Sequence, residues 1–95
     1  MYAVITQARI NRCRQTEMRA RLDEEVVPKA RQLPGFAGGS WFQALEGDGG
    51  FAVIAFDSED RARGFAERVA SGGPLADSPV WSVEGIATYE VLARV

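Results

Sequence analysis

The chain has 95 residues, an ordinary length for one domain, and we interpret residues 1–95 as a single domain. It carries 11 basic and 13 acidic residues and no histidine, and the formal net charge of −2 argues against nucleic acid as the main partner. No apolar run reaches the roughly 18–20 residues of a membrane span, and the N-terminus lacks a signal-peptide pattern. Cys13 is the single cysteine, so no internal disulfide can form. These features predict a cytoplasmic protein without a membrane partner.

The first part of the chain predicts a strand followed by a long helix. Residues 2–10, YAVITQARI, alternate between apolar and polar and are rich in strand-forming types. After a polar connection, Thr16 is expected to cap a helix that runs to Leu33. Its apolar residues recur at spacings of three and four: Met18, Leu22, Val26, Ala30 and Leu33. Pro28 lies inside this pattern, so a kink or break is expected near Glu24–Val27.

The stretch LPGFAGGSW at residues 33–41 predicts a sharp end to this helix. Proline cannot continue a helix, and Gly35 can adopt the positive φ that a helix end often needs. Phe36 is costly to leave in water, so we expect its ring to enter the core between helix and sheet.

Residues 38–46 and 51–57 predict two strands joined by a hairpin-type turn, GDGG at 47–50. In the second of these strands, FAVIAF carries apolar residues on both faces. A sheet that is covered by helices on one side normally shows polar residues on the other side. We therefore expect a second copy of the chain to cover that face in a homodimer. The alternative is a central strand whose second apolar face stays partly exposed.

The last part of the chain predicts a helix and a strand. Ser58 is expected to cap the second helix, which ends at SGG, residues 71–73. Trp81 falls in a loop-like segment, and residues 85–95 predict the final strand. The predicted order is βαββαβ with the helices on one face of an antiparallel sheet, which is an α+β, ferredoxin-like fold.

The element order, the chain length and the helix exit L-P-G-F-x-G at residues 33–38 resemble the antibiotic biosynthesis monooxygenase-like family of the dimeric α/β-barrel group. The resemblance covers residues 2–93. It implies that two ferredoxin-like subunits pack sheet against sheet and close a barrel, with a ligand pocket between helices and sheet in each subunit. It also implies one of several activities. Some members oxidise polycyclic phenols or anthrones with dioxygen alone, and others open haem.

The sequence departs from the haem-degrading members of that family. It has no histidine, and the region that matches their haem-ligand histidine reads WSVE at residues 81–84. Their first-strand asparagine aligns with Ala8, and their tryptophan after the third strand is absent from SEDRARGFAERV. Neither Cys13 nor the carboxylates form a cluster with metal-ligand spacing. We therefore expect no haem, no metal and no other cofactor.

A cofactor-free oxygenase needs a dry aromatic pocket, a polar group that helps to ionise a phenol or enol, and donors for the resulting anion. Two residues are candidates for catalysis: Arg9 to stabilise an enolate and Trp41 to stack on a flat substrate. Four residues are candidates for substrate binding: Gln7, Gln43, Trp81 and Tyr89. Each has a structural alternative. Trp41 and Tyr89 suit simple core positions, and Arg9 suits an ion-paired strand end. Trp81 suits a lid or a dimer contact.

Together these observations predict a homodimer that binds a small apolar, aromatic or polyketide-like molecule and resembles cofactor-independent monooxygenases. Two alternatives stay open. One is a non-catalytic binding or accessory dimer of the same fold, and the other is an isomerase or cyclase of the same barrel group.

Overall fold

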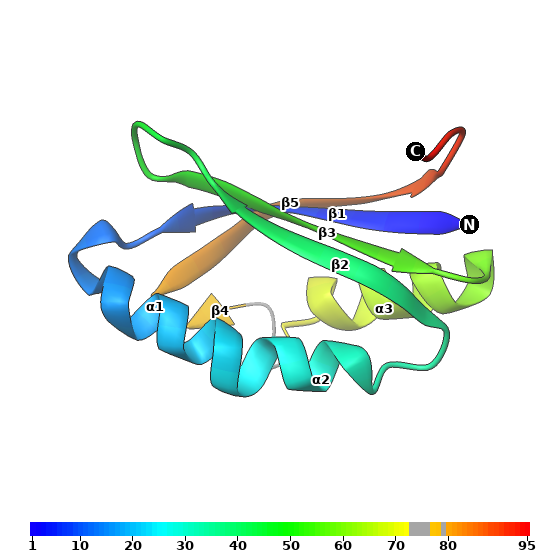
Figure 1. Ribbon diagram of the computed structural model, residues 1–95, viewed down its shortest axis with the longest axis horizontal. Helices are drawn as coiled ribbons and strands as arrows, with labels where there is room; N and C mark the ends of the chain where they lie inside the picture. Colours follow the sequence, from blue (N-terminus) through cyan, green and yellow to red (C-terminus); the bar gives the residue numbers. More distant parts are fainter. Residues whose placement is uncertain (73–76, 79) are drawn as a thin grey trace.

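The computed structural model describes residues 1–72, 77–78 and 80–95. In chain order its elements are β1 (Tyr2–Ile10), a 3-10 turn η1 (Arg12–Arg14), α1 (Gln15–Arg21), a π-helical turn η2 (Leu22–Val26), α2 (Val27–Arg31), β2 (Phe36–Gln43), β3 (Gly49–Phe56), α3 (Glu59–Ala70), β4 (Asp77–Ser78) and β5 (Trp81–Glu90). The strands form one sheet in the order β2-β3-β1-β5-β4, and every neighbouring pair is antiparallel (Figure 1).

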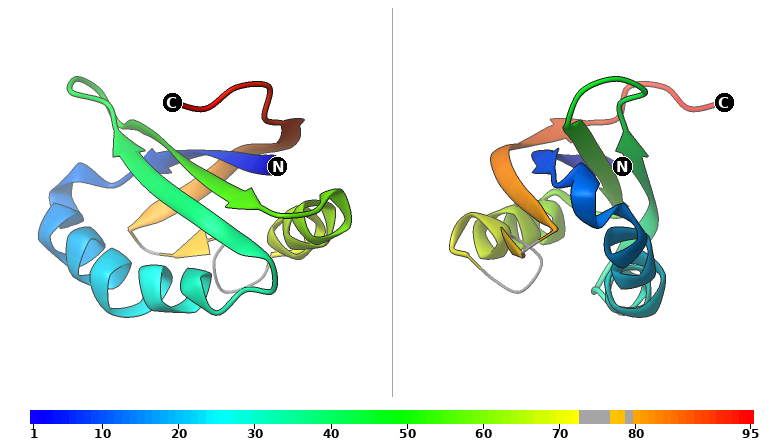
Figure 2. Two further views of the ribbon diagram at one scale, coloured as in Figure 1. Left: turned by 45° about the vertical axis from the view of Figure 1, so that its right-hand side comes forward. Right: turned by 90° about the vertical axis from the view of Figure 1, so that its left-hand side faces the viewer.

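The predicted α+β, ferredoxin-like architecture is confirmed. The segment from α1 to α2 and the helix α3 lie on the same side of the sheet, and none of the described helices covers the opposite side (Figure 2). The two-residue strand β4 is an addition to the predicted order at the outer edge of β5. None of the described helices is long and apolar enough to cross a membrane.

The main core lies between the sheet and α3. It is built from Val4, Ile54 and Phe56 of the sheet and Ala62, Phe65 and Val69 of α3. Val4 and Phe56 are fully buried, and the rings of Phe56 and Phe65 lie with their centroids 5.4 Å apart. The alternation of β1 places its even-numbered residues towards the helices and its odd-numbered residues on the bare face. This parity decides which polar residues can meet a ligand held under the helices.

The kink predicted before Pro28 is confirmed as the π-helical turn η2, Leu22–Val26. Proline has no N–H, and its ring would clash with the carbonyl four residues earlier in a regular helix. The N–H of Val27 bonds instead to the carbonyl of Leu22, five residues back. The helix is therefore widened in the turn that precedes the proline.

The prediction that Thr16 caps the first helix is wrong, because the helical segment begins earlier. Asn11 caps the 3-10 turn η1 that leads into α1, and its Oδ1 accepts a hydrogen bond from the backbone N–H of Cys13 at 3.1 Å. The helix α1 itself begins at Gln15 without a side-chain cap. Thr16 lies inside α1. The cap predicted at Ser58 is confirmed, since its hydroxyl accepts from the N–H of Arg61 at 3.3 Å.

The bounds of three strands differ from the predicted ones. The hairpin strands, predicted at residues 38–46 and 51–57, begin two residues earlier, at Phe36 and Gly49, and end earlier, at Gln43 and Phe56. The final strand, predicted at residues 85–95, begins at Trp81 and ends at Glu90, so Trp81 belongs to a strand and not to a loop. Trp81 belongs to the strand because it pairs with Ile10 at the far end of β1, and a bulge in β5 keeps the two strands in register.

The helix exit behaves as predicted. Gly35 has a φ of +77°, and a Cβ at this position would collide with the side chains of Asp57 and Arg61. The backbone N–H of Asp57 donates to the carbonyl of Gly35 at 2.9 Å, which fixes the turn against the end of β3. Phe36 is half-buried and packs against the main core.

Candidate functional site

Small side chains form the floor of a cavity between the sheet and the helices. One row across the sheet consists of Trp41, Ala52, Thr6 and Ile86. The neighbouring row consists of Gln43, Gly50, Ala8 and Val83. Glycine, alanine and threonine occupy the central strands β1 and β3 in both rows. They fill little volume, so they leave space beneath the helices.

The roof of the cavity comes from both helical segments. Leu22, Val26 and Ala30 face it from the bent helix, and Phe65 and Val69 face it from α3. Leu22 and Val26 are the two ends of the π-helical turn, so the widened part of the helix lies directly over the cavity. The cavity volume is about 90 Å³. An apolar cavity of about 150 Å³ accepts benzene, so an aromatic ligand requires the side chains around this cavity to move apart.

Two tryptophans line the cavity, Trp41 from β2 and Trp81 from the start of β5. A Cβ on Gly39 would lie 3.3 Å from the Trp41 ring, so the missing side chain of Gly39 allows the indole to pack closely against the backbone. The guanidinium carbon of Arg21 lies 6.0 Å from the centre of the Trp81 ring, at the outer limit of a cation–π contact. Two of the three predicted aromatic site residues therefore meet at one cavity, and Trp81 reaches it from a strand.

The polar groups of the cavity are few. Thr6 supplies the hydroxyl of the floor, and its side chain makes no hydrogen bond to any residue that the structure describes. No charged side chain is among the described residues that line the cavity. Within the same part of the chain, no group of three or more histidine, cysteine or acidic residues comes together as a metal site. The arrangement suits a neutral, largely apolar ligand.

Gln43 lies at the border of the cavity. It faces the helices in the same row as Ala8, but it does not line the cavity itself. The Nε2 of Gln15 donates to the Oε1 of Gln43 at 3.4 Å, which is long for a hydrogen bond. This contact joins the start of α1 to the end of β2, and Gln15 was not singled out in the sequence.

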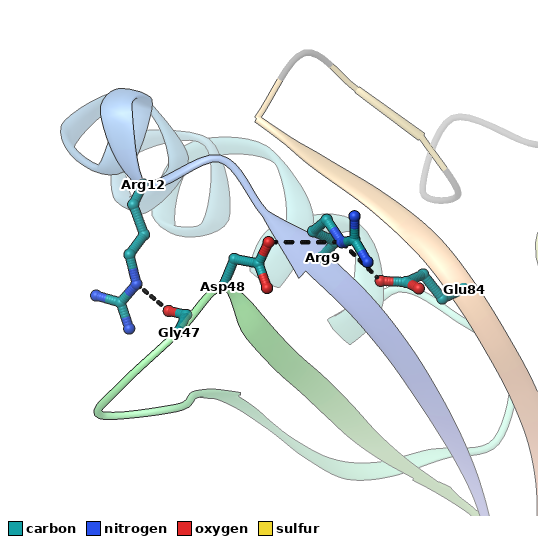
Figure 3. A network of polar contacts seen from close by, with 5 residues as sticks. All are labelled: Arg9, Arg12, Gly47, Asp48 and Glu84. Atoms are coloured by element: carbon teal, nitrogen blue, oxygen red, sulfur yellow. Dashed lines mark hydrogen bonds and ion pairs between the residues drawn. The ribbon is translucent and has the colours of Figure 1, made fainter.

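The remaining predicted site residues lie on the opposite face of the sheet. Arg9 Nε lies 3.2 Å from Glu84 Oε1 and 3.5 Å from Asp48 Oδ2 (Figure 3). Arg9 is therefore an ion-paired residue at the end of a strand, which is its structural alternative to a catalytic role. Gln7 is exposed on the same face, and Tyr89 is 51% exposed. Within one subunit the cavity therefore brings none of these three together with Trp41.

The β2–β3 hairpin is fastened to the end of β1. The guanidinium of Arg12 donates to the backbone carbonyl of Gly47 (Figure 3). It also donates to the backbone carbonyl of Ala44. The backbone N–H of Ile10 donates to the carbonyl of Asp48 at 2.7 Å. These bonds hold the hairpin, and through it the strand that carries Trp41.

Sequence reasoning missed Thr6, Ala8 and Leu22 as cavity residues. The signal was present as parity: Thr6 and Ala8 share the face of the fully buried Val4, whereas Gln7 and Arg9 do not. Choosing candidates by polarity alone selected the wrong face of β1.

Neither a protein-family model nor a curated protein matches the sequence. Solved structures do. The haem degrader MhuD from Mycobacterium tuberculosis, with two haems bound in its active site, matches with a TM-score of 0.75 and 18% identity over 100% of this chain and 99% of that chain. HapK from Hahella chejuensis matches with a TM-score of 0.72 and 14% identity over 100% of this chain and 96% of that chain. The monooxygenase ActVA-Orf6 from Streptomyces coelicolor, in complex with nanaomycin D, matches with a TM-score of 0.62 and 12% identity. This match covers 99% of this chain and 89% of that chain.

These matches span nearly the whole of each chain, and at such low identity they inform on the fold alone. All three proteins share the antibiotic biosynthesis monooxygenase fold that the helix exit and element order of this sequence resemble. The chain therefore has the fold of the antibiotic biosynthesis monooxygenases.

Proposed function

We propose that this chain forms a homodimer that binds a small aromatic molecule between its helices and its sheet. The observation that carries the proposal is the apolar cavity with Trp41 and Trp81 in its wall. Two matched structures support it, because MhuD holds haem and ActVA-Orf6 holds nanaomycin D on the same fold. We further propose that the activity is a cofactor-independent oxidation of an aromatic or polyketide-like substrate by dioxygen.

Haem does not fit the residues of this chain. The sequence has no histidine to ligate iron. No basic side chain among the described lining residues is placed to pair with the carboxylates of a porphyrin. A smaller, neutral ring is the better match.

In such an oxidation the substrate itself supplies the electrons to dioxygen, so the chain has to bind, orient and desolvate it. Trp41 offers a ring face for stacking, and the apolar roof excludes water. The amide of Gln43, at the border of the cavity, is placed to orient a substrate oxygen. We assign Gln7, Arg9 and Tyr89, on the other face, to the subunit contact.

The bare face of the sheet supports the homodimer. Phe42 and Phe51 stack there with ring centroids 4.6 Å apart, and they are 47% and 45% exposed. Ile5 and Val53 lie beside them on the same face. Monomers rarely expose a contiguous apolar patch of this kind, and the face is a sheet surface that a second sheet can cover. Arg9 and Glu84 form a charged rim beside the apolar patch.

A non-catalytic binding dimer is the second candidate function. The absence of any ionisable side chain among the described cavity-lining residues favours it, since general acid–base chemistry requires such a group within hydrogen-bond reach.

One experiment separates the two candidates. Purified protein is mixed with 1-naphthol or anthrone, without added flavin, haem or metal, and oxygen uptake and ligand binding are both followed. Binding with oxygen uptake that Trp41→Phe slows, and that the surface variant Lys29→Ala leaves unchanged, supports the oxygenase. Binding without uptake supports the binding protein, and the absence of binding contradicts both.

A further inference from the structure

We propose that residues 26–30 of the bent helix form a lid, which lifts from the sheet to admit a ligand while α3 stays in place. We call residues 26–30 the lid segment. This inference rests on the proposed small-molecule binding and adds the movement that opens the site. The reason for it is that the two helical segments pack on the sheet in different ways.

The helix α3 is part of the main core. Its three buried residues, Ala62, Phe65 and Val69, belong to one cluster with the buried residues of the sheet. The ring of Phe65 lies beside that of Phe56, a fully buried residue of β3. Protein interiors are close-packed, so lifting α3 would break many contacts at once. The helix α3 is therefore the fixed side of the cavity.

The lid segment belongs to neither core cluster. Val26 and Ala30 are buried, and both face the cavity. Neither belongs to the main core or to the second cluster, whose buried members are Ile10, Met18 and Val80. The lid segment therefore borders a space that is incompletely filled, and it gives up fewer contacts than α3 when it moves.

The two ends of the bent helix are better anchored than this part. Near its start, Met18 belongs to the second cluster and Leu22 packs against it. At its end, Leu33 packs against the main core, and the carbonyl of Gly35 accepts from the N–H of Asp57. Movement is therefore confined to the part of the helix between these anchors.

The backbone favours bending at the start of the lid segment. Pro28 has no N–H to donate to the carbonyl four residues earlier, and the π-helical turn η2 precedes it. Such positions are where helices bend. Among the described residues, no side-chain hydrogen bond or ion pair joins the lid segment to the sheet or to α3, since the contact of Gln15 with Gln43 lies before it. Lifting the lid segment therefore breaks apolar contacts alone.

Amide hydrogen exchange, followed residue by residue in the whole protein by nuclear magnetic resonance, tests the lid without a ligand. After correction for intrinsic rates, we expect the amides of the lid segment to exchange at least about tenfold faster than those of residues 62–69 in α3. The reason is that a helix with few contacts to the sheet opens more often. Equal protection of the two helices overturns the proposal.

Val26→Ala and Val69→Ala form a matched pair, because both residues are buried in helices and face the cavity from opposite sides. Val69→Ala should lower the melting temperature by several degrees, since it leaves a gap in the main core. Val26→Ala should lower the melting temperature less, and should speed exchange in the lid segment while leaving α3 unchanged. A larger loss of melting temperature in Val26→Ala would place the lid segment in the core and contradict the proposal.

Saturating 1-naphthol then tests the link to binding, which equilibrium dialysis measures separately. We expect it to slow exchange in the lid segment severalfold and to leave α3 unchanged. If 1-naphthol binds and slows exchange in α3 alone, or in neither helix, the lid is wrong and the proposed function stands. If 1-naphthol does not bind, the proposed function fails, and the role of the lid segment as a gate fails with it.

Discussion

Gly35 is the residue at which the chain turns from α2 into β2, and its backbone allows no ordinary side chain. Its φ of +77° lies in the left-handed region, and a Cβ would meet Asp57 and Arg61. Gly35→Val should lower the free energy of unfolding by at least about 1–3 kcal/mol, measured by urea denaturation.

Gly64→Ala is the matched control. Gly64 lies in α3 without a positive φ, and a Cβ there would meet nothing within 4 Å. Alanine favours a helix by up to about 1 kcal/mol over glycine, so this variant should be unchanged or more stable. Equal destabilisation by both substitutions would contradict the role given to Gly35.

For single residues, the sequence predicts local turns and helix caps but not which residues line the cavity. Gly35 and Ser58 were predicted correctly because turn and cap preferences depend on a few neighbouring residues. Thr6 was missed because its importance arises only when β1 and β3 pair and leave small side chains under the helices. Residue type drew attention to Arg9, whereas strand parity places it on the other face.

At the scale of elements, the widened turn before Pro28 shapes the roof of the cavity. Pro28→Ala supplies the missing N–H, and a regular helix would rotate Leu22 relative to Ala30. We expect stability to stay within about 1 kcal/mol or to increase, while 1-naphthol binding weakens severalfold in equilibrium dialysis.

Lys29→Ala, at the exposed neighbouring position, is the control and should leave binding unchanged. Unaltered binding in Pro28→Ala would show that the shape of the turn is irrelevant to the cavity.

Periodicity predicted the kinds of elements well and their ends less well. All nine residues of β1 were correct because apolar and polar residues alternate along it. The start of β5 was placed four residues late, because its pairing with the end of β1 joins residues some 70 positions apart and passes through a bulge. A local pattern contains no information about such a distant partner.

For the whole molecule, the two-faced strand β3 leads to opposite expectations for two adjacent residues. Val53 lies on the bare face, and Ile54 is 4% exposed within the core. Val53→Asp should leave a folded chain that sediments as a 10.3 kDa species, because the charge opposes packing of a second sheet.

Ile54→Asp should unfold the chain, with a loss of at least about 4 kcal/mol, because it buries an unpaired charge. Circular dichroism and sedimentation together distinguish the two effects. A Val53→Asp protein that remains dimeric would mean that the bare face is not the contact between copies.

The central claim, that a small aromatic molecule binds between the helices and the sheet, is tested most directly by nuclear magnetic resonance. The chain has two tryptophans, so a nitrogen–proton correlation spectrum contains two indole N–H signals, and both residues line the cavity. Titration with 1-naphthol should move the signals of Trp41 and Trp81 together and to saturation. Shifts confined to Ile5 and Val53 on the bare face, with both indole signals unmoved, would contradict the account.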